Sequence, residues 1–194
     1  MKKLSKKTKI KNVKKNAFEK LTPPQQRVAI AKDVLEQIRI KRFTPYSGKY
    51  ISSINFKNGL YKSEMGSKDI KSNFAKIKNC SVCAMGACLM SATKFANKLN
   101  FEDVGVHRTD FKDEKVKDLF SSIFSPEQLL LIEIAFEGND SGADRMGYDI
   151  FGADYPTCEI TQKCDEFYLK YEDEKSRMVA IMKNLIKNKG EFKP

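Results

Sequence analysis

Apolar positions recur every three or four residues in several long stretches, the spacing of helices that bury one face. The clearest stretch runs from about residue 23 to 42, with one apolar stripe made of Val28, Ala31, Val34, Leu35 and Ile38. The preceding segment, Thr22-Pro23-Pro24-Gln25, has a capping Thr, Pro in the first turn and Gln at the capping-box position. These signals predict a helix that starts there and ends near Arg42.

Two further stretches are apolar on nearly every side, which predicts helices at the centre of the core. The first covers about 80–98 and has no charged residue from Cys80 to Thr93. It contains Gly86, which costs about 1 kcal/mol of helix propensity relative to Ala, so we expect a neighbouring element to pack closely there. The second follows the start signal Ser125-Pro126-Glu127-Gln128 and ends before Gly138.

Shorter amphipathic patterns predict three more helices, at about 113–124, 157–171 and 173–188. Strand-like residues occur in one place, 50–64, around the turn signal Asn58-Gly59. The segment from 66 to 78 is expected to be an exposed connection. The predicted fold class is therefore mainly α: a single domain of about six helices with one small β-hairpin at about 50–64.

Positive charge is concentrated at the N-terminus. The chain of 194 residues has a net charge of +11, and residues 1–20 contribute nine lysines against Glu19 alone. This segment has no helical or strand period, which predicts a flexible basic arm at 1–20 followed by one globular domain at 21–194. The candidate nucleic-acid contacts are lysines of this arm: Lys2, Lys3, Lys6, Lys7, Lys9, Lys11, Lys14 and Lys15.

The arm contains Lys but no Arg, so it offers point charges without the bidentate fork that recognises bases. Any nucleic-acid binding should then be independent of sequence. The alternative is that the arm serves solubility only.

No apolar run is long enough for a membrane helix, and the N-terminus lacks the apolar region of a signal peptide. We therefore expect no membrane contact and a cytoplasmic location, in a bacterium or an infected host cell. Five cysteines, an odd number in a chain of this size, also fit a reducing compartment.

Four of those cysteines form a weak candidate for a zinc site: Cys80 and Cys83 in a C-x-x-C pair, with Cys158 and Cys164 as the second pair. The second spacing is wider than zinc knuckles use, and Cys83 lies in an apolar run where a free Cys behaves as a small hydrophobe. Structural packing is the favoured interpretation, with zinc binding and thiol chemistry as the alternatives.

No catalytic residue and no cofactor are predicted. The only histidine, His107, lies in a polar stretch, and Glu133 in an apolar helix is interpreted as a paired structural acid or, alternatively, as a carboxyl with a raised pKa. The loop at 138–156 is a candidate ligand or partner site through Asp140, Asp144, Asp149 and Asp154, although their spacing is not that of a calcium loop.

Four segments together resemble a family of small uncharacterised proteins of tailed phages and prophages. Two of them carry its C-x-V-C-A-x-G-A and F-S-x-x-Q-L-x-L-I-E-x-A-F-E motifs, and the four are 24–35, 80–87, 124–137 and 177–192. The resemblance implies a viral or prophage origin and an accessory role in the infected cell, and it implies no particular activity. The arm and the loop at 138–156 depart from the family pattern.

The leading functional hypothesis is a non-enzymatic phage accessory protein that binds a host or viral macromolecule, for example in host takeover or evasion of defence. One alternative is a small-ligand-binding or enzymatic domain that uses Glu133 and the loop at 138–156. Another is non-specific nucleic-acid binding through the arm. A closed apolar core would favour the first hypothesis, whereas polar groups converging around the helices at 80–98 or 126–137 would favour the second. Nothing in the sequence sets an oligomeric state.

Overall fold

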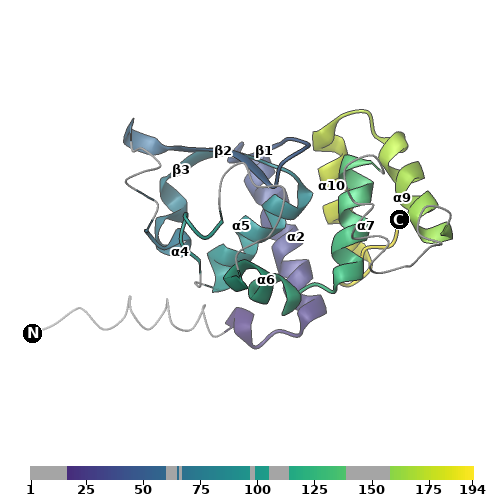
Figure 1. The fold of residues 1–194 in the computed structure, drawn as a ribbon, viewed down its shortest axis with the longest axis horizontal. Coiled ribbons are helices and arrows are strands. Elements are labelled where there is room, and N and C mark those ends of the chain that lie inside the picture. Colours follow the sequence, from purple (N-terminus) through teal and green to yellow (C-terminus); the bar gives the residue numbers. More distant parts are fainter. Residues whose placement is uncertain (1–16, 60–64, 66, 97–98, 105–113, 139–157) are drawn as a thin grey trace, which may run out of the picture.

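The computed structural model describes residues 17–59, 65, 67–96, 99–104, 114–138 and 158–194. Over these residues the chain is mostly helical with a small mixed sheet (Figure 1). The six expected helices are all present: α2 (Pro23–Arg39), α5 (Ala84–Ala96), α6 (Glu114–Ser121), α7 (Pro126–Glu137), α9 (Glu159–Lys170) and α10 (Glu174–Lys187). The short helix α4 (Ile70–Asn73) and two 3-10 turns, Lys57–Gly59 and Phe74–Lys76, complete the described helical structure.

Three strands form the sheet in the order β1-β3-β2: β1 (Phe43–Pro45), β2 (Ile51–Phe56) and β3 (Ile77–Val82). β1 runs parallel to β3, with Phe43 opposite Cys80, and β2 runs antiparallel to β3, with Ile51 opposite Val82. The parallel pair needs a long crossover, which here contains β2 and α4.

The structure bears on two expectations for this region. The strand expected near 50 is present as β2, but its partner among the described residues is β3, and 60–64 lie outside those residues. Cys80, Ser81 and Val82 belong to β3 rather than to the helix that follows, and β3 begins inside the segment expected to be a connection. The pairing joins segments about 25 residues apart, and such long-range hydrogen bonding leaves no local signal in the sequence.

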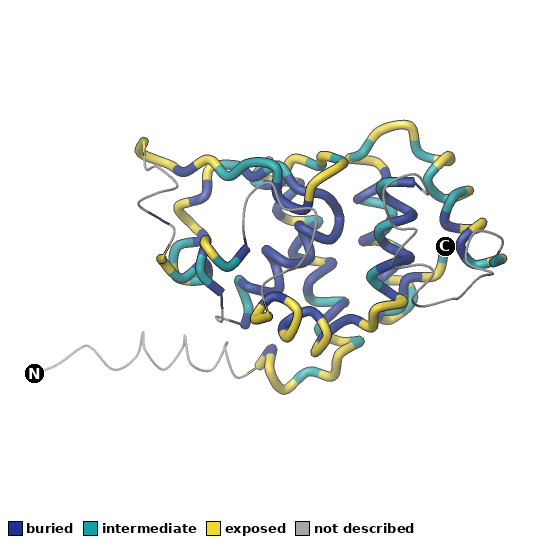
Figure 2. Tube along the Cα trace, in the orientation of Figure 1, coloured by how far each residue is buried: buried dark blue, intermediate teal, exposed yellow. Residues whose placement is uncertain are grey.

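Helix α5 forms the centre of the core, as its charge-free sequence predicts. Every residue of α5 is buried except Lys94 and Phe95, and the tube in Figure 2 shows this helix inside the other elements. Gly86 makes the close approach possible, because a Cβ at this position would lie 1.6 Å from the carbonyl oxygen of Tyr50 at the start of β2. The expectation of a neighbour packed on Gly86 is confirmed.

The boundary between arm and domain lies earlier than the sequence indicates. Ala17–Glu19 form a helical turn, and Phe18 is only 6% exposed, with its ring stacked on that of Phe95 at 4.8 Å. Phe18 therefore belongs to the core, and the segment that precedes the domain is shorter than 1–20. The eight candidate lysines of the arm lie outside the described residues.

Helices α2 and α10 pack as an antiparallel pair, with the end of α10 beside the start of α2. At the start of α2, Arg27 donates hydrogen bonds to the carbonyls of Ile123 and Gly190 and pairs with Glu191. At the other end, the Ser47 hydroxyl, which follows β1, donates to Glu174 at the start of α10. The C-terminal tail is anchored as well, because buried Phe192 exchanges backbone hydrogen bonds with the side chain of Gln128.

In the described part of the chain no single helix is both long and apolar enough to cross a membrane. Helices α6 and α7 reach that length only together, and the pair is bent by 98°.

Candidate functional site

Two glutamates one turn apart on the apolar helix α7 form the centre of the candidate site. The helix starts where the Ser125 hydroxyl accepts a hydrogen bond from the Gln128 amide, and it ends at Gly138, whose φ of 85° does not suit other residues. Within it, Glu133 and Glu137 are only partly exposed, and their spacing of four places both side chains on one face. A run of buried residues around them provides the low-dielectric surroundings.

The β1–β2 loop and α10 bring further polar groups to the same place. The amide of Gly48 donates a 2.8 Å hydrogen bond to Oε2 of Glu137, and the hydroxyl of Ser47 donates a 2.6 Å bond to Oε1 of Glu174. Arg177, one turn further along α10, is electrostatically coupled to Glu137. Three carboxylates and one guanidinium therefore converge where α7 ends and α10 begins.

Arg177 itself is fixed by its neighbours. Its Nη1 donates a 3.0 Å hydrogen bond to the carbonyl of Phe136, and its guanidinium carbon lies 4.2 Å from the centre of the Tyr168 ring on α9. The side chain is 93% buried, and its Nε has no hydrogen-bond partner in the part of the chain that the structure describes. Arg177 therefore supplies one positive charge beside three carboxyl groups.

Cys83, the residue before α5, lies near both glutamates. Its amide donates to the carbonyl of Tyr50 at 3.2 Å, and its sulfur accepts a 3.4 Å hydrogen bond from the amide of Gly86. Burial raises the pKa of this thiol well above its usual value, and the charges of Glu137 and Glu133 raise it further. Cys83 is therefore a neutral thiol, and the nucleophilic thiolate is disfavoured.

Both glutamates of α7 bind protons unusually tightly. Burial, followed by the charge of Glu137, raises the pKa of Glu133 to about 7. Burial also raises the pKa of Glu137 to about 7, opposed by the Gly48 amide and Arg177 and reinforced by Glu174. With pKa values of about 7, both carboxyls exchange protons near neutral pH, a property that suits a general acid or base and a receptor for a positively charged group.

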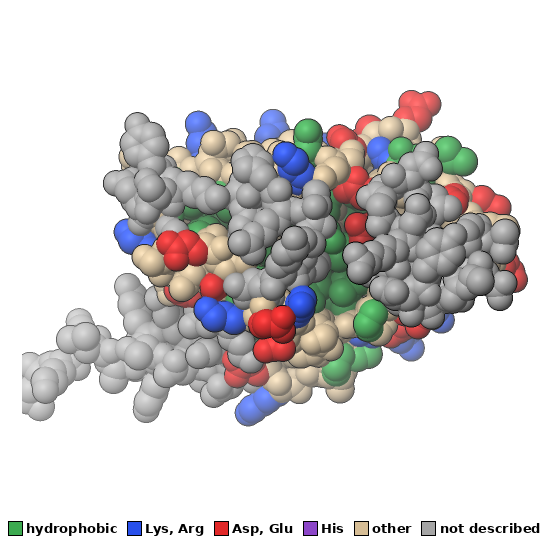
Figure 3. All heavy atoms as spheres, viewed as in Figure 1, with side chains coloured by type: hydrophobic (Ala, Val, Ile, Leu, Met, Phe, Trp, Pro, Cys, Tyr) green, Lys and Arg blue, Asp and Glu red, His purple; other side chains and the backbone are tan. Residues whose placement is uncertain are grey.

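One oxygen of the pair lacks a partner. Oε2 of Glu133 is buried, and no hydrogen bond reaches it in the described part of the chain. A buried acceptor without a partner costs about 1–3 kcal/mol, so it is an atom that a bound donor would stabilise. In the space-filling view, acidic side chains lie over α7 beside exposed hydrophobic atoms (Figure 3).

The structure separates the cysteines of the weak zinc candidate. Cys80 lies in β3 and Cys83 before α5, whereas Cys158 caps α9 and Cys164 is buried within it. No group of three or more His, Cys, Asp or Glu side chains in the described ranges could hold a metal ion. The favoured interpretation, structural packing, fits Cys80, Cys88 and Cys164, whose burial raises their pKa values.

The remaining sequence-based candidates lie outside the described residues. These are His107, the arm lysines and the four aspartates of the loop, Asp140, Asp144, Asp149 and Asp154. The structure does place the start of that loop, because Gly138 directly follows Glu137 and packs against the Tyr168 ring.

Sequence reasoning identified Glu133 but missed its partners. Glu137 could have been found, since it follows Glu133 by one turn in an apolar helix. Ser47, Gly48, Glu174 and Arg177 come from segments distant in the chain, and only the packing of α10 against α7 and β1 brings them together.

A hollow of about 530 Å³ lies elsewhere, between the first turns of α7 and α9 and the C-terminal tail. Of the three glutamates that line it, Glu159 pairs with Lys163 and Glu191 with Arg27.

Comparison of the chain with protein-family models, with curated proteins and with solved structures finds no match.

Proposed function

We propose that the protein binds a small ligand bearing a cationic or hydrogen-bond-donating group at the cluster formed by Glu133, Glu137 and Glu174. The observation that supports this proposal most directly is the buried oxygen Oε2 of Glu133, which has no hydrogen-bond partner among the described residues and lies one helical turn from the half-buried Glu137. Polar groups from three separate elements converge there, the arrangement that a ligand site requires and a purely structural core does not.

The two motifs behind the phage-family resemblance meet at this cluster. Cys83 comes from the segment at 80–87, and Glu133 and Glu137 come from the segment at 124–137. Their proximity is visible in the influence of both glutamates on the Cys83 thiol. Because residues of both motifs lie close together, a role in ligand binding is favoured over a role in packing alone.

Ligand binding should change the protonation of the pair. A cationic group favours the ionised carboxylates, so binding near pH 7 should release protons from Glu133 and Glu137. Calorimetry of alkylamine and guanidine ligands in buffers of different ionisation enthalpy measures this release directly.

The matched variants are Glu133→Gln, Glu137→Gln and, as a control, Glu127→Gln in the exposed first turn of the same helix. We expect binding and proton release to be lost in the first two and kept in the control. Unchanged binding in Glu133→Gln and Glu137→Gln, or no stabilisation of the native protein by any such ligand, would refute the proposal.

A second proposed function is that of a phage or prophage accessory protein that binds a host or viral macromolecule. It is supported by the resemblance and by the strongly uneven charge of the chain, whose first 20 residues carry +8. Affinity capture from infected cells with the intact protein, and with a variant lacking residues 1–16, tests it. Recovery of the same proteins and nucleic acid with an unrelated basic protein would count against it.

A further inference from the structure

Positive and negative charges are concentrated in different parts of the sequence. Residues 100–174 contain 19 acidic and seven basic side chains, a net charge of −12, so the remainder carries +23. In the structure the acidic stretch supplies α6, α7 and α9, whereas the basic remainder supplies α2, the sheet and most of α10 (Figure 1). An anionic partner would therefore approach the protein from one side.

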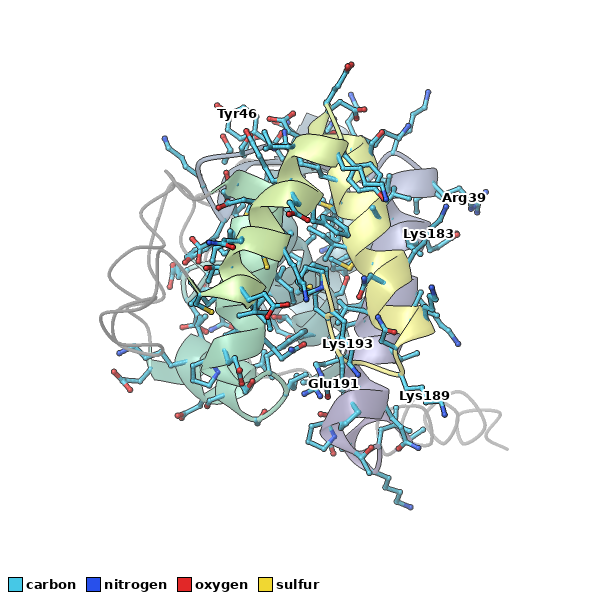
Figure 4. All side chains as sticks on the ribbon, turned by 90° about the vertical axis from the view of Figure 1, so that its right-hand side faces the viewer. Arg39, Tyr46, Lys183, Lys189, Glu191 and Lys193 are labelled. Carbon is cyan, nitrogen blue, oxygen red and sulfur yellow. The ribbon has the colours of Figure 1, made fainter. Side chains whose placement is uncertain are left out.

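The most regular basic surface lies on the antiparallel pair α2 and α10, and we call it the α2–α10 face. It consists of exposed side chains on these helices and just beyond α10: Lys32, Arg39, Lys183, Lys187 and Lys189. Figure 4 shows Arg39, Lys183 and Lys189 pointing away from the domain on the same side. Lys32 lies seven residues before Arg39 and Lys187 lies four after Lys183, spacings that keep each pair on one helix face.

The acids on these two helices and the tail are already engaged. Asp33 pairs with Lys94, Glu191 with Arg27, and Glu36 with Arg39 at 2.7 Å. None of the four lysines of the face forms an ion pair with a residue that the structure describes. Their charge is therefore exposed to solvent without local compensation.

The start of α2 lies beside the Lys189 end of this face. Gly190 packs against the backbone of Pro24 so closely that a Cβ would lie 2.2 Å from its carbonyl oxygen, which brings Lys189 next to the start of α2. Figure 4 shows Lys189 and Lys193 beside the first described residues. The sequence that leads into Ala17 carries eight more lysines.

We propose that the α2–α10 face binds the phosphate backbone of duplex nucleic acid without sequence preference. This inference rests on the second proposed function and names its partner class. Lys183 and Lys187 are separated by about 6 Å along the helix, and lysines act as point charges toward successive phosphates. The face lacks the large apolar side chains that anchor a helix in a membrane, since only Ile40 of the exposed hydrophobic residues adjoins it.

The experiment measures the affinity of a 30-base-pair random-sequence DNA duplex by fluorescence anisotropy over a series of salt concentrations. The test variant is Lys32→Gln, Lys183→Gln and Lys187→Gln combined, made in the full chain and in a chain lacking residues 1–16. The matched control, Lys117→Gln, Lys163→Gln and Lys170→Gln combined, removes the same charge from exposed positions on α6 and α9.

We expect the test variant to bind at least about tenfold more weakly at 100 mM salt, with the slope of log K against log salt reduced by about 2–3, and the control to match the unmodified protein. The effect should persist without residues 1–16, which separates the face from the arm. Equal losses in test and control variants, or no duplex binding at 50 mM salt, would overturn the inference. Preferential binding to vesicles containing phosphatidylserine would also overturn it. If any of these results were obtained, capture of a protein partner from infected cells would still support the second proposed function.

Discussion

The carbonyl oxygen of Tyr50 lies against the backbone of Gly86, where a Cβ would approach it to 1.6 Å. This contact seats the first turn of α5 on the start of β2, and the Cys83 amide donates its hydrogen bond to the same carbonyl. The position of Cys83 relative to Glu133 and Glu137 therefore depends on a residue without a side chain.

The first prediction concerns this contact. Gly86→Ala should destabilise the protein by about 2–3 kcal/mol, because backbone atoms, unlike a side-chain end, cannot move aside easily. Gly59→Ala is the control, since its Cβ would meet open space and only its positive φ of 67° would add a cost of about 1 kcal/mol. Urea unfolding measures both, and equal losses would show that the approach to Tyr50 is not decisive.

The second prediction concerns pH. Because the folded protein raises the pKa of Glu133 to about 7 from an ordinary value near 4.5, the protonated group stabilises the fold fully below pH 4.5 and that stability is lost as the pH rises through 7. Glu133→Gln keeps a neutral side chain, so its stability relative to the unmodified protein should increase by about 2–3 kcal/mol between pH 4.5 and 8. A constant difference over this range in denaturant unfolding would contradict the raised pKa.

The third prediction concerns the N-terminus. Deleting residues 1–16 should leave the melting temperature within a few degrees, whereas deleting 1–20 should lower it strongly, because only the second deletion removes Phe18. Phe18→Ala in the full chain should cost about 2–4 kcal/mol through lost burial and stacking on Phe95. Lys20→Ala, at an exposed position, is the control, and a similar loss in that variant would argue against a specific role for the Phe18 ring.

The fourth prediction concerns the C-terminal tail. Phe192→Ala should destabilise the protein by about 3–5 kcal/mol, since the ring is 1% exposed and its backbone is bonded to Gln128. The neighbouring exposed Lys193→Ala should be nearly neutral. Thermal unfolding of the two variants compares them, and equal melting temperatures would mean that the tail is not part of the cooperative unit.

The fifth prediction concerns the cysteines. In the native protein a thiol reagent should modify Cys158, which is partly exposed, well before the buried Cys80, Cys83, Cys88 and Cys164. Treatment with a chelator should leave both the labelling pattern and the melting temperature unchanged. Unfolding by the chelator would restore the zinc interpretation of Cys80 and Cys83.

The sequence by itself determined most of the helices. Thr22 with Gln25 and Ser125 with Gln128 mark helix starts through local hydrogen bonds, and the apolar stripes mark the buried faces, because both signals act within a few residues. The same locality explains the errors. β3 depends on pairing with β1 and β2, and Phe18 depends on a ring 77 residues away, so neither could be recognised from neighbouring positions.

Only the tertiary structure decided the site. The sequence places Glu133 and Glu137 on one helix, but it does not show that Gly48, Glu174 and Arg177 surround them, since that arrangement follows from how α7 and α10 pack. The same holds for the α2–α10 face, because lysines at 32 and 183 share a surface only once the two helices are antiparallel neighbours. Periodicity and capping are local, whereas burial, pKa values and charged surfaces arise from contacts between distant segments.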